Sequence, residues 1–412
     1  MKEKNVLIIT GVFPPEPVVS ATITNDVAIE LSKKYVVTVL CPKPTRPLGY
    51  KFDDVGHVLN MPYKRVELDS YVFPKSELLG RFRESISMGR HAVRYINEHY
   101  DEIDLIYNAP WQLFGCYMIS RVAKKYKIPY ITPVQDFYPE SLLAKIPAWK
   151  WLQKMVVSIL LPIDKATLSN ARKVHTISDK MKIYLAKTRG IDERRFAVIQ
   201  NWQDEEQFVN YLNTHKPEKS KDDPFTFMYL GNVSSMAGID IVIDAFALAK
   251  IPDARLVIAG AGSEKESLQK LSMQYNDVDI QFWNAPKAKV PEIQDRADVM
   301  VLPLKKGFSL SSIPSKLPSY LFSAKPVIAC VDFNSDTALS IISSQCGWVE
   351  EPENIEHLKV CMQKASATEK DILEKMGENG FNFAMTHFSR RSNLPKLCKV
   401  YEDILDAKEL NM

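Results

Sequence analysis

The stretch that decides the fold is residues 297–331, ADVMVLPLKKGFSLSSIPSKLPSYLFSAKPVIACV. Its pattern predicts a buried strand at 299–304, a basic and serine-rich loop, a helix over about 314–324, and a second buried strand at 326–331. A loop rich in hydroxyl and N–H groups that opens a helix suits an anion such as a diphosphate, and Lys316 lies in the first helical turn. An ordinary strand–helix–strand unit, whose Ser and Pro residues only cap the helix, explains the same local pattern.

Apolar runs alternate with helical segments on both sides of this stretch. Near the N-terminus, KNVLIITG at 4–11 and YVVTVLC at 35–41 are typical of strands that are buried on both faces. The loop GVFPPEPVVSA leads into a helix between them, for which Ser20 or Thr22 is the expected N-cap. A strand, a helix and a strand in such close succession form a βαβ unit, so we expect a parallel sheet.

The same alternation continues through the rest of the chain. Further strands are predicted at 103–107, 130–133, 173–177, 196–199, 225–231, 254–260 and 279–283. Further helices are predicted at 76–100, 111–126, 147–171, 178–189, 237–249, 263–275 and 290–296, and throughout 353–410. Residues 42–75 have several prolines and mixed charge, and we expect them to be irregular.

Two domains are expected, because 412 residues are too many for one ordinary core. The segment 203–224 is polar and charged without an apolar period, which is typical of a domain linker. We predict an α/β protein with two doubly wound Rossmann-like domains that face a cleft, and with C-terminal helices that pack back across the domains. The N-terminal domain is predicted at 1–202 and the C-terminal domain at 225–388, with a helix at 389–412 that returns to the N-terminal domain.

The composition, with 46% hydrophobic and 25% charged residues, is that of a soluble globular protein. The six cysteines are scattered, without a Cys-x-x-Cys pair or a Cys/His cluster, so neither a disulfide framework nor a structural zinc is indicated. The N-terminal apolar run is too short for a signal-peptide core. The longest uncharged apolar run, at 155–163, has half the length of a spanning helix. We therefore expect a cytoplasmic protein without a membrane-crossing segment.

Charge is distributed unevenly between the two halves of the chain. Residues 1–200 carry ten more basic than acidic side chains, and the remainder carries seven more acidic than basic ones. This asymmetry predicts that the N-terminal half faces a polyanionic surface.

Residues 147–166, in the basic half, have the composition of an interfacial helix, with two tryptophans, three lysines and an apolar stripe. Peripheral docking on the anionic inner leaflet of the cytoplasmic membrane would explain this composition, and so would an ordinary core helix. The side chains expected to face the membrane are Trp149, Lys150, Trp151 and Lys154.

Seven short motifs point to a known family. They are FPPEP with the following SA at 13–21, VQDFYPES at 134–141, TISDKM at 176–181, VIQNWQDEEQF at 198–208, YLGN at 229–232, VIAGAGSE at 257–264 and IPSKLPSYLFSAKPVIA at 313–329. In this order and spacing they resemble the GT-B glycosyltransferases of family 4, and within that family the bacterial enzymes that build capsule, O-antigen and other surface polysaccharides. The resemblance covers nearly the whole chain.

The resemblance implies a retaining glycosyltransferase. It would move a hexosyl or N-acetylhexosaminyl group from a nucleotide sugar, usually a UDP-sugar, to a lipid-linked or growing glycan acceptor. The donor would bind mainly to the C-terminal domain and the acceptor to the N-terminal domain. The family requires no metal or other cofactor, so helix N-termini and basic side chains must neutralise the diphosphate. We expect peripheral association with the cytoplasmic membrane and no nucleic-acid partner.

The expected donor-binding residues lie in the loops of the C-terminal domain. Glycines at strand ends permit a nucleotide to approach the backbone closely, although turn geometry alone also explains them. Trp283 is expected to pack in the core, beside loop residues that the resemblance places near the base. The donor-binding set is Gly231, Asn232, Gly260, Gly262, Asn284, Lys287, Ser311, Ser312, Ile313, Lys316 and Ser319.

The chain departs from the family pattern where the donor is held. Family members usually carry two glutamates separated by seven residues, and the corresponding positions here are Ser311 and Ser319. The usual Arg and Lys after the first strand of the donor domain correspond to Asn232 and, approximately, Ala237. Serine can bind hydroxyls, but it offers no carboxylate to a developing positive charge. An unusual donor geometry, or a weakened or absent activity, would follow.

In the N-terminal domain, the loop DFYPE after the strand at 130–133 carries the candidate catalytic residues Asp136 and Glu140. By resemblance, Asp136 occupies an active-site position at which many relatives carry His or Asp. A helix cap by Asp136 or Ser141 explains the same loop. His175 lies in a strand pattern and is expected to be structural. The acceptor-side loop is expected to include Glu16, Pro17 and Ser20.

Two alternatives to the enzyme remain open. The serines at 311 and 319 are compatible with a catalytically weak or inactive GT-B subunit that binds a sugar nucleotide or a partner enzyme. A GT-B sugar-nucleotide epimerase is the third hypothesis. It would need acid–base residues in the cleft, and no histidine is expected there.

Overall fold

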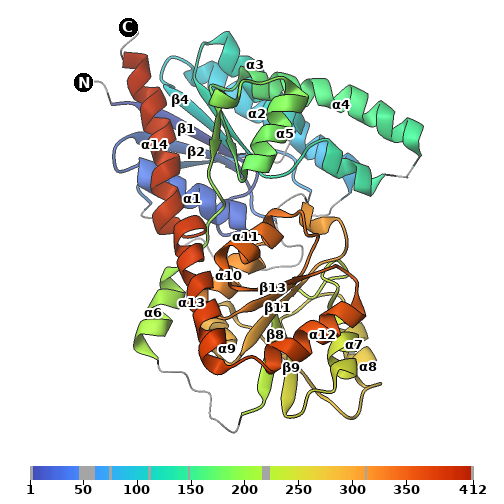
Figure 1. The fold of residues 1–412 in the computed structure, drawn as a ribbon. Coiled ribbons are helices and arrows are strands. Elements are labelled where there is room, and N and C mark those ends of the chain that lie inside the picture. The colour runs from blue at the N-terminus through green and yellow to red at the C-terminus, as the bar shows by residue number, and fades with distance from the viewer. Residues whose placement is uncertain are drawn as a thin grey trace. The chain divides into compact units, whose positions relative to one another are not determined.

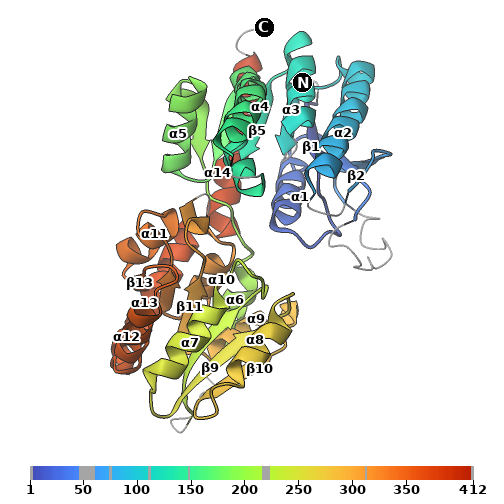
Figure 2. The same cartoon turned by 90° about the vertical axis from the view of Figure 1, so that its right-hand side faces the viewer.

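The chain forms two compact units, each built on a parallel sheet with helices on both faces (Figures 1 and 2). The computed structural model describes residues 3–45, 61–73, 77–109, 113–146, 149–215, 223–310 and 313–409. Unit 1 comprises Met1–Asn201 and Asn393–Met412, and unit 2 comprises Trp202–Ser392.

The sheet of unit 1 has seven strands in the order β3-β2-β1-β4-β5-β6-β7, and each described pairing is parallel. The strands are β1 (Asn5–Thr10), β2 (Val36–Pro42), β3 (Lys64–Leu68), β4 (Leu105–Ala109), β5 (Tyr130–Val134), β6 (Lys173–Thr176) and β7 (Phe196–Val198). In β1 every residue from Val6 to Thr10 is buried. Such continuous burial is expected of a parallel strand that helices cover on both sides.

Helices of unit 1 pack on both faces of this sheet. The main core joins β1 and β4 to α2 (Leu78–His99), α3 (Leu113–Lys125) and α5 (Asp179–Arg189). The tyrosine ring centroids of Tyr107 in β4 and Tyr401 in α14 (Arg390–Glu409) lie 5.3 Å apart. Because Ile106 belongs to the main core, its neighbour Tyr107 points to the opposite face, and α14 covers that face. Unit 1 also contains α1 (Val19–Leu31), α4 (Lys150–Asn170) and the 3-10 helices η2 (Glu140–Lys145) and η3 (Glu193–Arg195).

The sheet of unit 2 has six parallel strands in the order β10-β9-β8-β11-β12-β13. They are β8 (Phe225–Leu230), β9 (Ala254–Ala259), β10 (Asp279–Trp283), β11 (Val299–Pro303), β12 (Val327–Cys330) and β13 (Gly347–Glu350). One face packs on α7 (Ile239–Ala249), α8 (Lys265–Ser272) and α12 (Ile355–Ser366). The other packs on α6 (Glu206–Thr214), α9 (Val290–Asp295), α10 (Lys316–Phe322), α11 (Asp336–Ser344) and α13 (Lys370–His387).

The stretch at 297–331 forms the predicted strand, loop, helix and strand as β11, α10 and β12. All five residues of β11 and all four of β12 are buried, which explains why their apolar runs identified both segments as buried strands. The two strands are neighbours in the sheet, and Met300 pairs with Val327. The chain around them therefore has the doubly wound Rossmann-like architecture that the alternating pattern predicted.

Several predictions about local structure are wrong. The expected linker 203–224 contains α6, whose Phe208 is buried and lies 5.9 Å from Phe322 between ring centroids. Residues 64–68, expected to be irregular, form edge strand β3. Neither Ser20 nor Thr22 caps α1, because the helix begins at Val19 with Val18 in the capping position. The elements η2, α11 and β13 were not predicted.

Candidate functional site

In unit 2 the strand order reverses between β8 and β11, and ligands of doubly wound sheets bind beyond the carboxyl ends of strands at such a point. Gly231 follows β8 directly and has a φ of +154°. A Cβ atom at Gly231 would lie 2.4 Å from Cε of Lys316, so the lysine side chain runs directly over this glycine. The Lys316 Nζ lies 5.4 Å from the centroid of the Tyr229 ring. The structure thus brings Gly231 and Lys316 together at the switch point.

Lys316 is a cation for which the described residues provide no carboxylate partner. Burial lowers the pKa of its ammonium group, and in the part of the chain that the structure describes no carboxylate forms an ion pair with it. It occupies the first position of α10, where the helix dipole disfavours a positive charge. The Tyr229 ring offers some compensation through its negative face. A bound anion would relieve both the burial and the dipole.

The other two glycines serve the packing of the chain itself. A Cβ atom at Gly260 would lie 2.1 Å from the carbonyl oxygen of Gly231, and one at Gly262 would lie 2.0 Å from that of Val233. Gly260 also has a φ of +136°, a conformation that favours glycine. These glycines therefore let the loops after β8 and β9 approach each other. This close packing explains why glycine occupies both positions, whether or not a nucleotide binds there.

The remaining expected donor residues are spread over neighbouring loops. Asn232 is exposed, and its carbonyl oxygen accepts a hydrogen bond from the Tyr229 hydroxyl at 2.5 Å. Asn284 and Lys287 are exposed after β10. Ile313 is partly buried against the core of unit 2. Ser311 and Ser312 lie outside the described residues, so their placement is not assigned.

Ser319, at the second glutamate position of the family, is engaged with the protein. Its Oγ accepts a hydrogen bond of 3.0 Å from Nε2 of Gln294, a fully buried residue of α9. Two residues that the sequence did not reveal also shape this region. The Tyr320 hydroxyl donates to the carbonyl of Leu230 and accepts from its N–H, at 2.8 and 2.9 Å, so it fixes the end of β8. Lys265 Nζ donates to the carbonyl of Gly260 at 3.1 Å.

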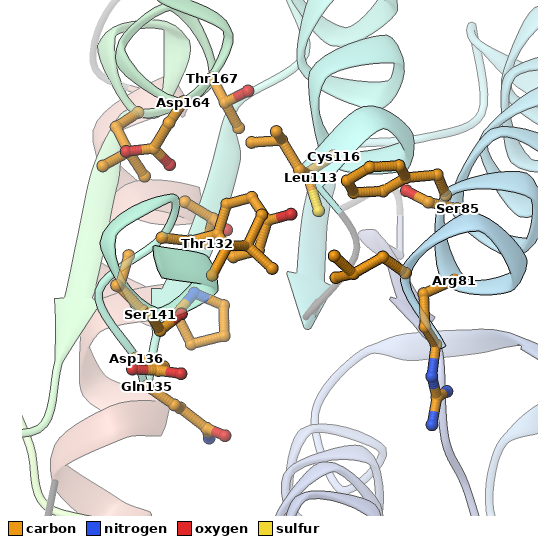
Figure 3. Close-up of a pocket in the computed structure, with 17 residues that line it drawn as sticks. Arg81, Ser85, Leu113, Cys116, Thr132, Gln135, Asp136, Ser141, Asp164 and Thr167 are labelled. Atoms are coloured by element: carbon orange, nitrogen blue, oxygen red, sulfur yellow. The ribbon is translucent and has the colours of Figure 1, made fainter. Parts of the chain in front are cut away.

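Unit 1 contains a pocket of about 330 Å³ near the carboxyl end of β5, between α2, α3 and α4 (Figure 3). Asp136 and Gln135, which follow β5, lie at one end of it with Arg81 of α2. Asp164 and Thr167 of α4 lie at the other end. The structure therefore places the candidate catalytic Asp136 on the wall of a pocket. The residue in the capping position of η2 is Pro139, whose side chain makes no capping hydrogen bond.

Glu140 lies in a buried ion cluster. The Arg189 guanidinium donates through Nη1 and Nη2 to the two Glu140 oxygens at 2.7 and 2.8 Å, and through Nε to Asp164 Oδ2 at 2.8 Å. Its last two donors reach the Thr188 hydroxyl and the Tyr138 carbonyl. All five N–H groups are thus satisfied, and Arg189 is fully buried. This engagement gives Glu140 a structural role in place of the predicted catalytic one.

The two carboxyls of this cluster shift in opposite directions. Burial raises the pKa of Asp164 to about 6, and the single bond from Arg189 only partly offsets it. Burial also acts on Glu140, but hydrogen bonds from Arg189 and from the Tyr184 hydroxyl outweigh it and lower the pKa. The number of donated hydrogen bonds explains the difference, because each one favours the charged form.

The acceptor-side loop after β1 is shaped by Glu16. This residue is buried, and its Oε1 accepts a hydrogen bond of 2.8 Å from the N–H of Thr45. Pro17 is exposed beside it, and Ser20 is half-buried in the first turn of α1. His175 is buried in β6, where its Nε2 lies 2.7 Å from the carbonyl oxygen of Ile199 and burial lowers its pKa to about 4. These contacts indicate structural roles for Glu16 and His175.

The predicted membrane-facing residues lie at the exposed start of α4. Trp149 and Trp151 are 60% and 64% exposed, with stacked rings 6.1 Å apart, and Lys150 and Lys154 are exposed beside them. Further along, Leu160, Thr167 and Leu168 are buried. The helix is therefore half in the core and half at the surface. No helix within the described ranges has the length and apolarity needed to cross a membrane.

Groups that could bind a metal are lacking among the described residues, where no three His, Cys, Asp or Glu side chains cluster suitably. The chain has one Asp-x-Asp sequence near a strand, Asp277 and Asp279, at the amino end of β10. Asp279 pairs with Arg255 at 2.6 Å and Asp277 with Lys250 at 3.9 Å. Both carboxylates are thus paired at the end of the sheet opposite to the strand-end loops.

Two family descriptions match the chain and together cover most of it. Glycosyltransferase Family 4 matches residues 20–207, within unit 1 and the start of unit 2. Glycosyl transferases group 1 matches residues 211–383, within unit 2. The boundary between the two matches, at residues 207–211, lies close to the start of unit 2 at Trp202.

Curated relatives are similar over part of their length. WbjE of Pseudomonas aeruginosa, assigned as a glycosyltransferase, is 24% identical over 58% of this chain and 60% of its own. WcaI of Escherichia coli, assigned as a colanic acid biosynthesis glycosyl transferase, is 22% identical over 56% of this chain and 58% of its own. The match thus spans about three fifths of these relatives.

Solved structures share the fold over nearly the whole chain. A glycosyltransferase of Rickettsia africae has a TM-score of 0.68 at 16% identity, covering 98% of this chain and 99% of its own. Anabaena HepE, solved in complex with UDP, has a TM-score of 0.67 at 13% identity, covering 97% of this chain and 100% of its own. At these identities the likeness establishes the fold.

Proposed function

Because the chain belongs to the glycosyltransferases of family 4 with the GT-B fold, we propose that it is a retaining enzyme that transfers a hexosyl or N-acetylhexosaminyl group from a UDP-sugar. The acceptor is a lipid-linked or growing glycan of a surface polysaccharide such as a capsule or O-antigen. Unit 2 binds the donor, and unit 1 binds the acceptor. The similarity to WbjE and to WcaI, which is assigned to colanic acid biosynthesis, supports a role in polysaccharide biosynthesis.

Lys316 is the observation that carries the proposal. The half-buried ammonium group of Lys316 lies above Gly231 at the switch point and has no counter-ion among the described residues, so a diphosphate would complete this site. In the reaction the bond between the anomeric carbon and the diphosphate oxygen breaks, and the nucleotide leaves with the electron pair. A preorganised cation stabilises this developing negative charge without a metal.

Asp136 acts on the donor sugar and the acceptor hydroxyl, whereas Lys316 acts on the leaving diphosphate. As the glycosidic bond weakens, positive charge develops on the sugar, and a carboxylate stabilises such an oxocarbenium-like centre or orients the attacking hydroxyl. Asp136 follows β5 and lines the pocket of unit 1. Glu140 is excluded from this role by its bonds to Arg189.

Replacing Lys316 with methionine tests the donor site. The substitution keeps the apolar stem over Gly231 and Tyr229 and removes only the charge, so we expect UDP to bind at least tenfold more weakly, or about 1.4 kcal/mol. Calorimetric titration with UDP measures this loss. Lys270→Met, which removes an exposed lysine of α8, is the control and should leave the affinity unchanged. Equal UDP affinity in the two variants would refute the donor site.

The exposed start of α4 supports peripheral docking on the cytoplasmic membrane. Tryptophans and lysines on one end of a helix suit the interface between lipid headgroups and acyl chains. We expect the protein to float with anionic vesicles at low salt, and Trp149→Ser with Trp151→Ser to abolish flotation. A wild-type protein that stays in the soluble fraction would contradict membrane docking and leave the donor site unaffected.

The structure favours one alternative function through Ser319. With its hydroxyl bound by Gln294 and no glutamate at this position, the donor sugar and ribose have weaker partners than in the family pattern. A subunit that binds a sugar nucleotide without turning it over would then bind UDP normally. Failure to release UDP from any of several UDP-, GDP- and dTDP-sugars, with lipid extract as acceptor, would identify this case.

A further inference from the structure

The pocket of unit 1 adjoins an apolar cluster that the protein leaves half covered. Only Leu113, Leu142 and Leu160 of this cluster are buried. The members that are partly exposed are Leu78, Phe82, Phe114, Tyr138, Val156 and Ile163. This cluster is separate from the main core of the unit. Such a concentration of incompletely buried apolar surface marks a site at which another apolar group binds.

The size of the pocket suits a short stretch of hydrocarbon. Its volume of about 330 Å³ is roughly twice that of a cavity, ~150 Å³, that holds one benzene molecule. It also lies at the lower end of the range of about 300–1,000 Å³ that is typical of small-molecule sites. About ten carbon atoms can therefore enter.

The hydroxyls at the inner end of the pocket are engaged with the protein. Thr167 Oγ1 donates to the carbonyl of Ile163 at 2.9 Å, and Ser85 Oγ accepts from the N–H of Gly115 at 2.9 Å. Asp164 Oδ2 accepts a hydrogen bond of 2.8 Å from Nε of Arg189. A sugar, which needs many hydrogen-bond partners, would find few here. An apolar chain needs none.

The other end of the pocket is polar and carries charge. Figure 3 shows Arg81, Gln135 and Asp136 at this end, away from Thr167 and Asp164. Arg81 also pairs with Glu84 at 3.2 Å, which holds its guanidinium on α2. Glu84 offsets the charge of Arg81, and Asp136 adds a carboxylate, so a molecule with a polar head and an apolar tail matches this gradient along the pocket.

The helices that line the pocket also present apolar side chains to the outside. Trp151, Met155 and Ile159 recur every four residues on α4 and are exposed, so they form a stripe on one face of the helix. On α2, Leu79 is 84% exposed, and its neighbour Leu78 lines the pocket. The interior of the pocket and a lipid-facing surface are thus provided by the same two helices.

We propose that this pocket binds the first carbons of the hydrocarbon chain of a lipid-linked acceptor, with its polar head at the end where Gln135 and Asp136 lie. This inference rests on the proposed function for the lipid-linked nature of the acceptor. It adds that unit 1 recognises the lipid anchor itself and that the chain runs from the Asp136 end toward Thr167.

The test uses geranyl phosphate, a ten-carbon prenyl phosphate, below its micelle threshold. We expect saturable binding by calorimetry, with no measurable binding of inorganic phosphate and weaker binding of dimethylallyl phosphate, since each methylene lost from the buried chain weakens binding roughly fourfold. Thr167→Phe places a ring in the pocket and should weaken geranyl phosphate binding at least tenfold.

Ser158→Phe is the matched control. Ser158 is an exposed residue of the same helix, and its hydroxyl, like that of Thr167, donates to a carbonyl in the preceding turn. We expect it to bind geranyl phosphate within twofold of the wild type. A second pocket variant, Leu142→Ala, enlarges the pocket and should shift the preference toward farnesyl phosphate. Urea denaturation of each variant, followed by circular dichroism, reports whether unit 1 has folded.

Three outcomes would overturn the inference. They are equal binding by Thr167→Phe and Ser158→Phe, equal binding of inorganic and geranyl phosphate, and displacement of geranyl phosphate by a methyl glycoside, which would make the pocket a sugar site. The measurement needs no donor, so failure here leaves UDP binding and transfer to a soluble glycan intact. Failure of the proposed function would instead appear as no nucleotide release with any donor.

Discussion

Arg189 in unit 1 and Lys316 in unit 2 are both cations that the surrounding protein shields from water. They differ in whether carboxylates of the described residues pair with them. Arg189 has two carboxylates and a hydrogen-bond acceptor for each of its five donors. Lys316 has an aromatic face and, among the described residues, no ion-pair partner. A complete set of partners identifies a group that holds the fold together, whereas an incomplete set identifies a group that awaits a ligand.

Removing Arg189, the cation whose hydrogen-bond partners are complete, gives the largest expected effect on the free energy of unfolding. Arg189→Met leaves Glu140 and Asp164 without their cation in a buried site, and breaking such a cluster costs about 3–5 kcal/mol of unfolding free energy. Urea denaturation measures the loss. Arg194→Met, which removes a highly exposed arginine from its pair with Asp192, should leave the unfolding free energy nearly unchanged. Similar costs for both variants would break the comparison.

The second effect separates the two acidic residues of the loop after β5. Asp136→Asn should lower the rate of sugar transfer about a hundredfold or more, without a change in UDP affinity or stability. Glu140→Gln should do the reverse, because it weakens a buried ion pair and touches no reacting group. Nucleotide release and urea denaturation of both variants check this. Transfer by Asp136→Asn at a rate near that of the wild type would remove Asp136 from the reaction.

The elements were predictable where burial is strong and the partners are close in sequence. The strands β11 and β12 were found within one residue because every residue in them is buried. Strand β3 was missed because this edge strand, KRVEL, buries only Leu68. Helix α6 was missed because it contributes one buried residue, Phe208, to a charged segment.

The site was less predictable because its contacts join distant residues. Arg189 lies 49 residues from Glu140 and 25 from Asp164, so nothing local distinguishes it from an ordinary basic residue at a helix end. Gly260 was interpreted as a place for a nucleotide, but its true neighbour is the carbonyl of Gly231. The placement of Lys316 at the start of a helix was predictable, because the helix after the serine-rich loop is visible in the local sequence, whereas its donor-binding role stays a prediction.

The smallest effect is a slope in stability with pH. In the unfolded chain Asp164 titrates near its ordinary pKa of 3.8 and in the folded chain near 6, so between these values the folded state binds more protons and becomes more stable as the pH falls. Asp164→Asn should flatten this slope between about pH 4.5 and 6. Below that range the lowered pKa of Glu140 acts in the opposite sense and removes stability. Denaturation at several pH values checks both signs, and an unchanged slope in Asp164→Asn would contradict the assignment.

Helix α14 has a consequence for how the protein is made. Its residues from Asn393 onward belong to unit 1, and Leu397, Tyr401 and Leu405 are buried there, although they are nearly the last part of the chain. A chain emerging from the ribosome has all of unit 2 before it has the final layer of unit 1. Unit 1 is therefore synthesised first but completes its core last. Until α14 has been synthesised, the apolar face around Tyr107 remains exposed, and chaperones can bind it.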